Sequence, residues 1–137
     1  MKVYVAAKFE RAAFVKQVYE VLTKAGHTIT HDWTNENDSH CVSFEERIEY
    51  QQRCAQNDLQ GVRDADVLVL IPHPNGKGCY YEFGAAMALN IPVIILGDWM
   101  DKALCIFERL VPPHRWVRLV LAWEEELLIA VGFSHVV

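Results

Sequence analysis

The sequence has no excess of positive charge and no long apolar run. Its 13 Lys and Arg residues are outnumbered by 18 Asp and Glu residues, which gives a formal net charge of -5. A protein that binds a nucleic acid polymer needs a basic face, so we expect no such partner. No apolar stretch reaches the roughly 18 residues that span a bilayer, and we expect no membrane partner either.

Signals for secretion, disulfide bonding and metal binding are also missing. The first three residues open a strand pattern rather than a signal peptide. The four cysteines are widely spaced and form no C-x-x-C pair, so we expect reduced thiols in a cytoplasmic protein. His31, His40 and Cys41 span a strand end and a loop without a recurring ligand spacing, so we predict no metal site and no cofactor.

Repeats, low-complexity segments and linkers are absent, and what remains is typical of one folded unit. The 137 residues suffice for a real hydrophobic core, and the hydrophobic fraction of 52% suits a compact fold. We therefore predict a single domain over residues 1–137.

Short apolar runs alternate with amphipathic segments along this domain. The runs predict strands at residues 2–6, 27–31, 67–72, 92–96 and 116–119. The amphipathic segments predict helices at residues 10–25, 43–61, 79–90, 101–109 and 123–131, with a polar loop at 32–42. This alternation predicts an α/β fold: a three-layer sandwich with a five-stranded parallel sheet, flavodoxin-like or Rossmann-like. A ligand site is expected at the carboxyl ends of the strands.

Glu82 follows the third strand and its glycine-containing loop, in the first turns of a helix. The residues around it are small or apolar, so this helix is expected to be buried on several sides. The carboxylate either stabilises the helix N-terminus or lines a cavity, where burial would perturb its pKa. Gly84 costs a helix about 1 kcal/mol relative to Ala. Its presence predicts that another group approaches the backbone closely.

Other candidate residues are less distinctive by themselves. Residues 76–78 (G-K-G) either cradle a phosphate at a helix N-terminus or form an ordinary loop, and they match neither a Walker A nor a G-x-G-x-x-G pattern. No G-x-S-x-G or Cys/His arrangement indicates acyl transfer. Asp58, Asp64 and Asp66 precede the third strand, and spacing does not separate them.

Three segments together resemble the nucleoside 2-deoxyribosyltransferase family, which includes the 2'-deoxynucleoside 5'-phosphate N-hydrolases. They are residues 4–9 (Y-V-A-A-K-F), residues 57–59 (N-D-L) with Ala65-Asp66 before the apolar strand, and residues 78–84 (G-C-Y-Y-E-F-G). The resemblance runs from Lys2 to about Gly97. It implies an enzyme that cleaves or transfers the N-glycosidic bond of a (deoxy)nucleoside or its 5'-monophosphate.

The resemblance also implies roles for individual residues. Glu82 matches the nucleophile that attacks C1' and forms a glycosyl-enzyme intermediate. Asp58 matches the acid that assists departure of the base, and Tyr4 matches a tyrosine that orients the nucleophile. Two carboxylates with these roles fit the chemistry of a retaining glycosidase, in which one must be ionised and the other protonated.

The substrate contacts follow from the same resemblance. Lys8, Arg11 and Lys77 are candidates for a 5'-phosphate, beside Gly76 and Gly78, and we expect Phe9 and Trp33 to stack on the base. Phosphate-binding members carry a serine-rich and glycine-rich first loop and a hydroxyl six residues before the nucleophile. This chain has A-K-F-E at residues 7–10 and Gly76 instead.

The expected partner is a small nucleoside or nucleotide, and the family resemblance implies a homo-oligomer. Two alternatives stay open: a non-catalytic nucleotide-binding or sensor module, and a hydrolase of another N-riboside such as a nicotinamide nucleotide.

Overall fold

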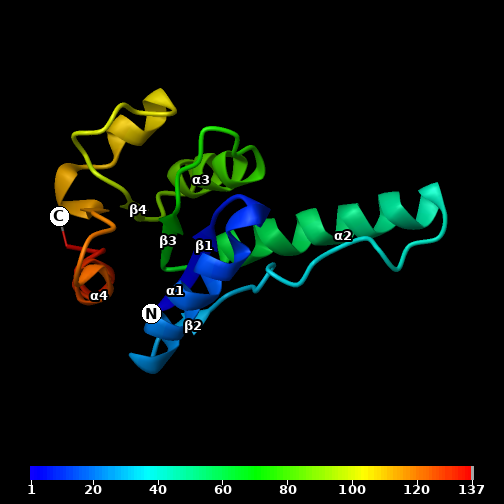
Figure 1. Cartoon of the computed structure of the whole chain (residues 1–137), viewed down its shortest axis with the longest axis horizontal. Coiled ribbons are helices and arrows are strands. Elements are labelled where there is room, and N and C mark those ends of the chain that lie inside the picture. The colour runs from blue at the N-terminus through cyan, green and yellow to red at the C-terminus, as the bar shows by residue number, and fades with distance from the viewer. Residues whose placement is uncertain (137) are drawn as a thin grey trace.

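A five-stranded sheet lies at the centre of the computed structural model, which describes residues 1–136; Val137 lies outside the described residues. All strands are parallel, in the order β2-β1-β3-β4-β5 (Figure 1). Their bounds are Lys2–Ala6 (β1), Thr28–Ile29 (β2), Val67–Leu70 (β3), Val93–Leu96 (β4) and Trp116–Val117 (β5). This is the flavodoxin-like strand order, and the predicted α/β architecture is confirmed.

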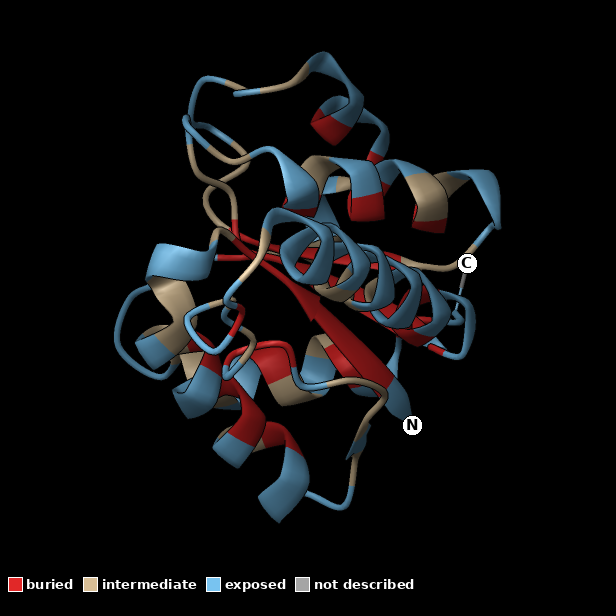
Figure 2. Ribbon diagram, turned by 90° about the vertical axis from the view of Figure 1, so that its right-hand side faces the viewer, coloured by how far each residue is buried: buried red, intermediate tan, exposed pale blue. Residues whose placement is uncertain are grey.

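Four α-helices cover the two faces of the sheet. Helices α1 (Ala12–Lys24) and α4 (Trp123–Gly132) pack against each other on one face, and α2 (Phe44–Arg63) and α3 (Gly78–Ala88) pack on the other (Figure 1). Figure 2 shows the buried residues on the strands and on the inward sides of the helices. Residues 67–70 (V-L-V-L) are buried throughout because a parallel strand covered on both faces exposes neither set of side chains.

Helix α2 is unusual in its length and exposure. It begins at the N-cap Ser43, whose side chain accepts a hydrogen bond from the backbone N–H of Glu46, as its capping-box pattern predicts. Only Gly61 and Val62, near its end, are buried. The exposed part projects beyond the sheet, with the preceding loop running alongside it (Figure 1). The carboxyl-terminal part of α2 is therefore the part that can contribute to a site at the sheet.

Several predicted boundaries differ from the structure. The strand predicted at 116–119 ends at Val117, and the helix predicted to begin at residue 10 starts with the 3₁₀ helix η1 (Phe9–Arg11). Residues 101–109 do not form an α-helix. The 3₁₀ helix η2 (Ile106–Leu110) is present instead, and the two prolines that follow it prevent its extension. A further 3₁₀ helix, η3 (Pro113–Arg115), begins with a proline and leads into β5.

The sequence predicts close packing at Gly84, but the structure shows it at Gly61. A Cβ added to Gly84 would meet no atom within 4 Å, so the predicted close approach to its backbone is wrong. Gly61 lies inside α2, which continues to Arg63, and a Cβ there would lie 2.8 Å from the Cβ of His31 and 2.9 Å from the Tyr4 ring. The close packing therefore occurs at Gly61. Among residues 1–136, no helix has the length and apolar character to cross a membrane.

Candidate active site

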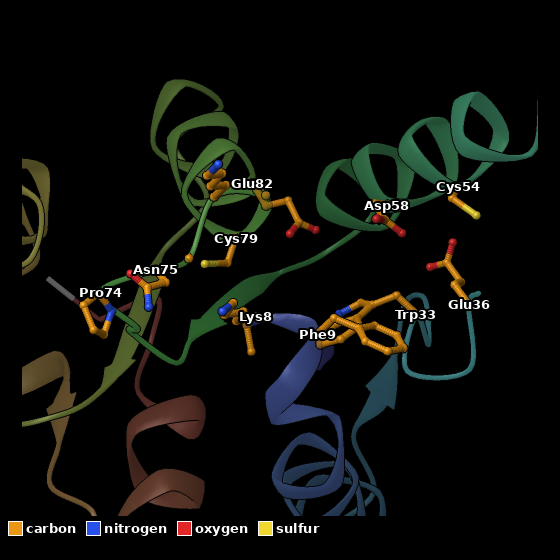
Figure 3. Close-up of a pocket in the computed structure, with 14 residues that line it drawn as sticks. Lys8, Phe9, Trp33, Glu36, Cys54, Asp58, Pro74, Asn75, Cys79 and Glu82 are labelled. Atoms are coloured by element: carbon orange, nitrogen blue, oxygen red, sulfur yellow. The ribbon is translucent and has the colours of Figure 1, made fainter. Parts of the chain in front are cut away.

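A cavity of about 850 Å³ opens at the carboxyl ends of β1 and β3, between α2 and α3 (Figure 3). These two strands end in register, with Ala6 beside Leu70. The chain leaves β1 and β3 toward opposite sides of the sheet here, which is where flavodoxin-like folds bind ligands. The lining residues are Ala7, Lys8, Phe9, Trp33, Glu36, Cys54, Asp58, Pro74, Asn75, Gly76, Lys77, Gly78, Cys79 and Glu82.

Glu82 projects from α3 into this cavity and is one of few buried charged residues, with 9% of its surface exposed. Tyr4, fully buried on β1, donates a hydrogen bond from its hydroxyl to Oε2 of Glu82. Burial raises the pKa of Glu82 to about 7; the Tyr4 hydrogen bond acts in the opposite direction, and the charge of Glu36 adds to the rise. The pKa of Tyr4 is raised far above its usual value, first by burial and then by Glu82. Tyr4 therefore remains a hydrogen-bond donor.

Asp58 faces the same cavity from α2 (Figure 3). Burial, then a hydrogen bond and the negative charge of Glu36, then Glu82, raise the pKa of Asp58 to about 8. Asp64 and Asp66, which spacing alone left equivalent to it, do not line the cavity. Asp64 accepts a hydrogen bond from a neighbouring glutamine on α2, and Asp66 accepts one from the backbone N–H of Lys2 at 2.8 Å.

Asp58 belongs to a compact cluster with His31 and Glu36. Nε2 of His31 lies 3.2 Å from Oε1 of Glu36 and 3.3 Å from Oδ1 of Asp58. The three potential ligand atoms lie within 4.8 Å of one another, so these residues could hold a divalent cation. His40 and Cys41, considered with His31 in the sequence, contact each other at 3.7 Å and lie outside this cluster.

Two positively charged residues, Lys8 and Lys77, also line the cavity. Lys8 follows β1, and residues 76–78 lead into the N-terminus of α3. Lys8 forms an ion pair with Glu10 at 2.7 Å. A Cβ at Gly76 would lie 2.7 Å from Sγ of Cys79, so this loop is tightly packed. The structure does not bring Arg11 into the cavity; its guanidinium lies over the Phe14 ring, 4.9 Å from the centroid.

Phe9 and Trp33 form an aromatic wall on the β1 side of the cavity (Figure 3). Their ring centroids lie 6.3 Å apart with an interplanar angle of 46°. The indole N–H of Trp33 donates to the carbonyl of Val5 at 2.7 Å, which fixes the buried ring against β1. Phe9 is 53% exposed and can contact a flat ligand at the mouth.

Sequence reasoning missed six residues of the lining, four of which carry polar or thiol side chains: Ala7, Pro74, Glu36, Cys54, Asn75 and Cys79. Burial is the main cause that raises the pKa of both thiols to about 11, and these cysteines therefore stay protonated at neutral pH. The sequence does predict that the loop containing Glu36 reaches the site, because it follows a parallel strand. The loop consists almost entirely of polar residues, however, so its sequence does not indicate which side chain points into the cavity.

The fold and part of the sequence are similar to those of known proteins. The fold is similar to that of a 2-deoxyribosyltransferase from the psychrotolerant bacterium Bacillus psychrosaccharolyticus, with a TM-score of 0.69, 22% identity, and 93% of this chain and 90% of that chain covered. It is also similar to the Clostridium botulinum CMP N-glycosidase BcmB, with a TM-score of 0.59, 19% identity, and coverage of 97% and 98%. No curated protein matches the sequence.

The sequence pattern is more specific than the fold. The model of the nucleoside 2-deoxyribosyltransferase family matches residues 3–113, which include Asp58 and Glu82 and the helices α2 and α3 that carry them. The match covers most of the chain, and the chain belongs to the nucleoside 2-deoxyribosyltransferase family.

Proposed function

We propose that this protein cleaves or transfers the N-glycosidic bond of a (deoxy)nucleoside or its 5'-monophosphate through a glycosyl-enzyme intermediate on Glu82. The observation that carries the proposal is the pair of carboxylates, Glu82 on α3 and Asp58 on α2, facing one cavity. Family membership supports the reaction class, and the two similar solved structures are a 2-deoxyribosyltransferase and a CMP N-glycosidase. The first protein transfers a deoxyribosyl group, and the second acts on a nucleotide.

In the first step, a carboxylate oxygen of Glu82 attacks C1' of the sugar. The C1'–N bond breaks, its electron pair moves to the departing base, and Asp58 gives its proton to that base. The hydroxyl of Tyr4 holds the other end of the Glu82 carboxylate and favours its ionised form. The hydrogen bond from Tyr4 lowers the pKa of Glu82, and the neighbouring Glu36 raises that of Asp58, so these surroundings favour the proton on Asp58.

In the second step, the acceptor attacks C1' of the glycosyl ester and releases Glu82. Asp58, now ionised, removes the proton from the acceptor. Water as the acceptor gives hydrolysis, and a second base gives transfer. The same two carboxylates serve both outcomes, so the choice of acceptor depends on what else occupies the cavity.

The charge distribution in the cavity supports an orientation for the substrate. Lys8, Lys77 and the loop that leads into the N-terminus of α3 line the cavity, and these groups can stabilise a 5'-phosphate or the 5'-hydroxyl. Phe9 and Trp33 line the side on which the base is placed. The sugar then spans the space between Glu82 and Asp58.

Product analysis tests the reaction. The protein is incubated with deoxynucleosides, ribonucleosides and their 5'-monophosphates, with and without a second free base, and the products are separated by chromatography. Free base and free sugar indicate hydrolysis, and a new nucleoside indicates transfer. If no substrate reacts while a nucleotide still raises the melting temperature, the reaction is excluded and the protein is a nucleotide-binding module.

Two variants test the assignment of the carboxylates. Glu82→Ala should abolish turnover while the melting temperature shows a folded protein, and the intact-mass adduct of a sugar on the quenched enzyme should disappear with it. Asp58→Asn should lower the rate by a factor on the order of 10² or more. Asp64→Asn, at the C-cap of the same helix, is the matched control and should retain the rate. Full activity of Glu82→Ala would refute the mechanism.

We also propose that the protein forms a homo-oligomer. Several large apolar side chains around η2 and α3 are exposed, among them Ile106, Phe107, Leu110 and Leu89. A second copy of the chain would bury them. Light scattering coupled to size-exclusion chromatography measures the assembly, and a monomer at micromolar concentration would contradict this part of the proposal.

A further inference from the structure

Glu36 lines the cavity from a loop whose backbone is held on both sides of it. Its own N–H donates to the carbonyl of Trp33 at 3.1 Å, and the N–H of Asn37 donates to the hydroxyl of Tyr50 on α2 at 3.0 Å. The side chain of Glu36 is 21% exposed, and its carboxyl group points toward α2 on the side of Asp58 (Figure 3). These contacts make Glu36 a fixed part of the cavity wall.

His31 places the carboxyl group of Glu36 beside that of Asp58. Its Nε2 lies 3.2 Å from Oε1 of Glu36 with hydrogen-bond geometry, and 3.3 Å from Oδ1 of Asp58. One oxygen of each carboxyl group and the ring nitrogen therefore lie within 4.8 Å of one another. Two carboxyl groups at this separation can contact neighbouring atoms on the edge of one planar ring.

The space in front of the two carboxyl groups has room for such a ring. A second cavity of about 500 Å³ shares Phe9, Glu36, Cys54 and Asp58 with the main cavity, so the open space extends along α2. Phe9 is 53% exposed and offers a flat surface to a ligand. A ring that packs beside Phe9 can place its edge against Glu36 and Asp58.

Hydrogen-bond acceptors dominate this side of the cavity. A carboxylate accepts hydrogen bonds and donates none. Among the lining residues, side-chain N–H donors are carried by Lys8, Asn75 and Lys77, which belong to the loops after β1 and β3. The indole N–H of Trp33 is already bound to a backbone carbonyl. An amino group of a ligand that faces Glu36 therefore finds an acceptor, whereas a carbonyl oxygen in the same place meets another acceptor.

We propose that Glu36 is a specificity-determining residue that selects bases with an amino group next to the ring nitrogen that Asp58 protonates. The proposal rests on the proposed function, in which Asp58 gives its proton to the departing base. Cytosine has this pattern at N3 and its 4-amino group, and adenine has it at N7 and its 6-amino group. The ring nitrogen takes the proton of Asp58 while the amino group donates to Glu36. The electron pair of the broken C1'–N bond stays on the base, which leaves as a neutral molecule.

The corresponding keto bases lack this pattern. Uracil has a carbonyl at C4 beside an N–H at N3, and hypoxanthine has a carbonyl at C6 beside N7. In both, an oxygen lone pair faces the Glu36 carboxylate where the amino bases place an N–H. Polar groups left without partners in a half-buried site weaken binding in the ground state and the transition state, so the keto bases should react more slowly.

Matched substrate pairs test this selection on the wild-type protein. Cytosine is compared with uracil, and adenine with hypoxanthine, each pair on the same sugar. The ratio of kcat/KM for the amino substrate to that for the keto substrate should be about 10 or more. Substrates whose amino nitrogen is dimethylated have no N–H to donate and should react as slowly as the keto substrates. A dimethylated substrate that reacts as fast as the amino substrate would overturn the proposal.

Glu36→Gln replaces an acceptor with a group of the same shape that also donates. The amino-to-keto ratio should fall by about 10-fold or more, because the amide N–H can pair with the carbonyl of a keto base. Glu36→Ala should also lower the ratio. Glu49→Gln, the same substitution at an exposed position of α2, is the matched control and should leave the ratio unchanged. An equal loss of rate for all substrates in Glu36→Gln, with the ratio unmoved, would mean a structural role and overturn the selection.

Binding measurements separate this proposal from the proposed function. Calorimetry with Glu82→Ala, in which the ligands stay intact, measures the affinity for the 5'-monophosphates of cytidine and uridine and for their 2'-deoxy forms. The cytosine ligands should bind about 10-fold or more tightly, and Glu36→Gln in the same background should remove the difference. If this is found while no substrate is turned over by the wild-type protein, only the proposed function fails.

Three outcomes of the binding experiment would overturn the selection by Glu36. Equal affinities for the cytosine and uracil ligands would do so, and the proposed function would stand if the wild-type protein still cleaves N-glycosidic bonds. Absence of binding by all of these ligands would also do so. A preference that disappears when a chelator is added would assign Glu36 to a metal ion instead.

Discussion

Glu82 and Asp58 carry the same functional group, and their surroundings give them different affinities for a proton. Burial raises the pKa of both. Glu82 receives the hydroxyl of Tyr4, which partly offsets the effect of burial, whereas Asp58 has the negative charge of Glu36 beside it. One hydrogen-bond donor and one like charge would thus be sufficient to divide the proposed roles of nucleophile and acid between the two carboxylates.

Replacing Tyr4 by Phe removes one hydroxyl group and so tests its hydrogen bond to Glu82. Without the hydroxyl, Glu82 loses the hydrogen bond that lowers its pKa, so its pKa rises above about 7. Because the nucleophile must be ionised, the acid limb of the pH–rate profile should move to higher pH, and activity at pH 6 should fall by about 10-fold, equivalent to one pKa unit. Steady-state kinetics from pH 5 to 9 measure the limb.

The matched control for Tyr4→Phe is Tyr81→Phe, since Tyr81 precedes Glu82 and is 79% exposed. It should leave the profile unchanged. An acid limb at the same pH in wild-type protein and Tyr4→Phe would show that the hydroxyl does not act on the charge of Glu82.

At the scale of elements, one glycine in α2 allows the site to form. Gly61 packs against His31 at the end of β2 and against the ring of Tyr4 on β1. One turn earlier on the same helix, Asp58 faces the cavity. The absence of a side chain at Gly61 lets α2 approach both strands, which brings Asp58 within reach of His31.

Gly61→Ala should therefore destabilise the protein in spite of its better helix propensity. Alanine favours a helix by about 1 kcal/mol over glycine, but a Cβ at 2.8 Å from His31 and 2.9 Å from Tyr4 requires backbone movement. Such overpacking costs about 1–3 kcal/mol and outweighs the propensity gain. The melting temperature should fall, and kcat should fall with it because His31 and Tyr4 are displaced together.

Gly84→Ala in α3 is the control with the opposite sign. A Cβ there meets nothing within 4 Å, so the helix propensity gain of about 1 kcal/mol should appear as a higher melting temperature. Thermal unfolding of both variants decides the comparison. A stabilised Gly61→Ala would show that the packing around α2 is looser than these contacts indicate.

The two glycines also illustrate what sequence patterns convey at this scale. The alternation of apolar runs and amphipathic segments predicted every strand and the α/β class, because burial on both faces imposes continuous apolar runs. A glycine inside a helix can mark a position of close packing, but it can also occur without one. The sequence does not distinguish these cases, and only the tertiary contacts separate Gly61 from Gly84. In the same way, spacing could not choose among Asp58, Asp64 and Asp66; the family resemblance chose Asp58, and contacts separate the three. Glu36 depends on the path of a loop, which local sequence does not encode.

At the scale of the whole molecule, the two carboxylates give the reaction a narrow pH range. Glu82 must be ionised, so activity should rise as the pH increases through about 7, and Asp58 must be protonated, so activity should fall as the pH increases through about 8. We predict a bell-shaped profile of kcat/KM with its maximum between these values. A profile that stays level from pH 5 to 9 would contradict the division of roles between the two acids.

The raised pKa of Asp58 also makes the stability of the folded protein depend on pH. The pKa of an aspartate in an unfolded chain is about 3.9, whereas the pKa of Asp58 in the folded protein is about 8. As the pH rises from about 4 to about 8, the unfolded state loses this proton first, so stability decreases across that window and stays low above it. Stability present at low pH is thus lost where the enzyme works.

Asp58→Asn removes this titrating group. Substitutions at half-buried sites usually destabilise a protein, but this one should stabilise it at high pH. At pH 8 the variant should melt about 2 °C or more above the wild-type protein. At pH 4, where Asp58 is protonated in the folded state and about half protonated in the unfolded state, most of that advantage should vanish. Asp64→Asn, whose partner is a glutamine amide near the surface, should show no such pH-dependent gain. Calorimetry across this range measures both. An equal difference at pH 4 and pH 8 would mean that Asp58 does not retain its proton in the folded protein, and with that result its role as an acid would fail.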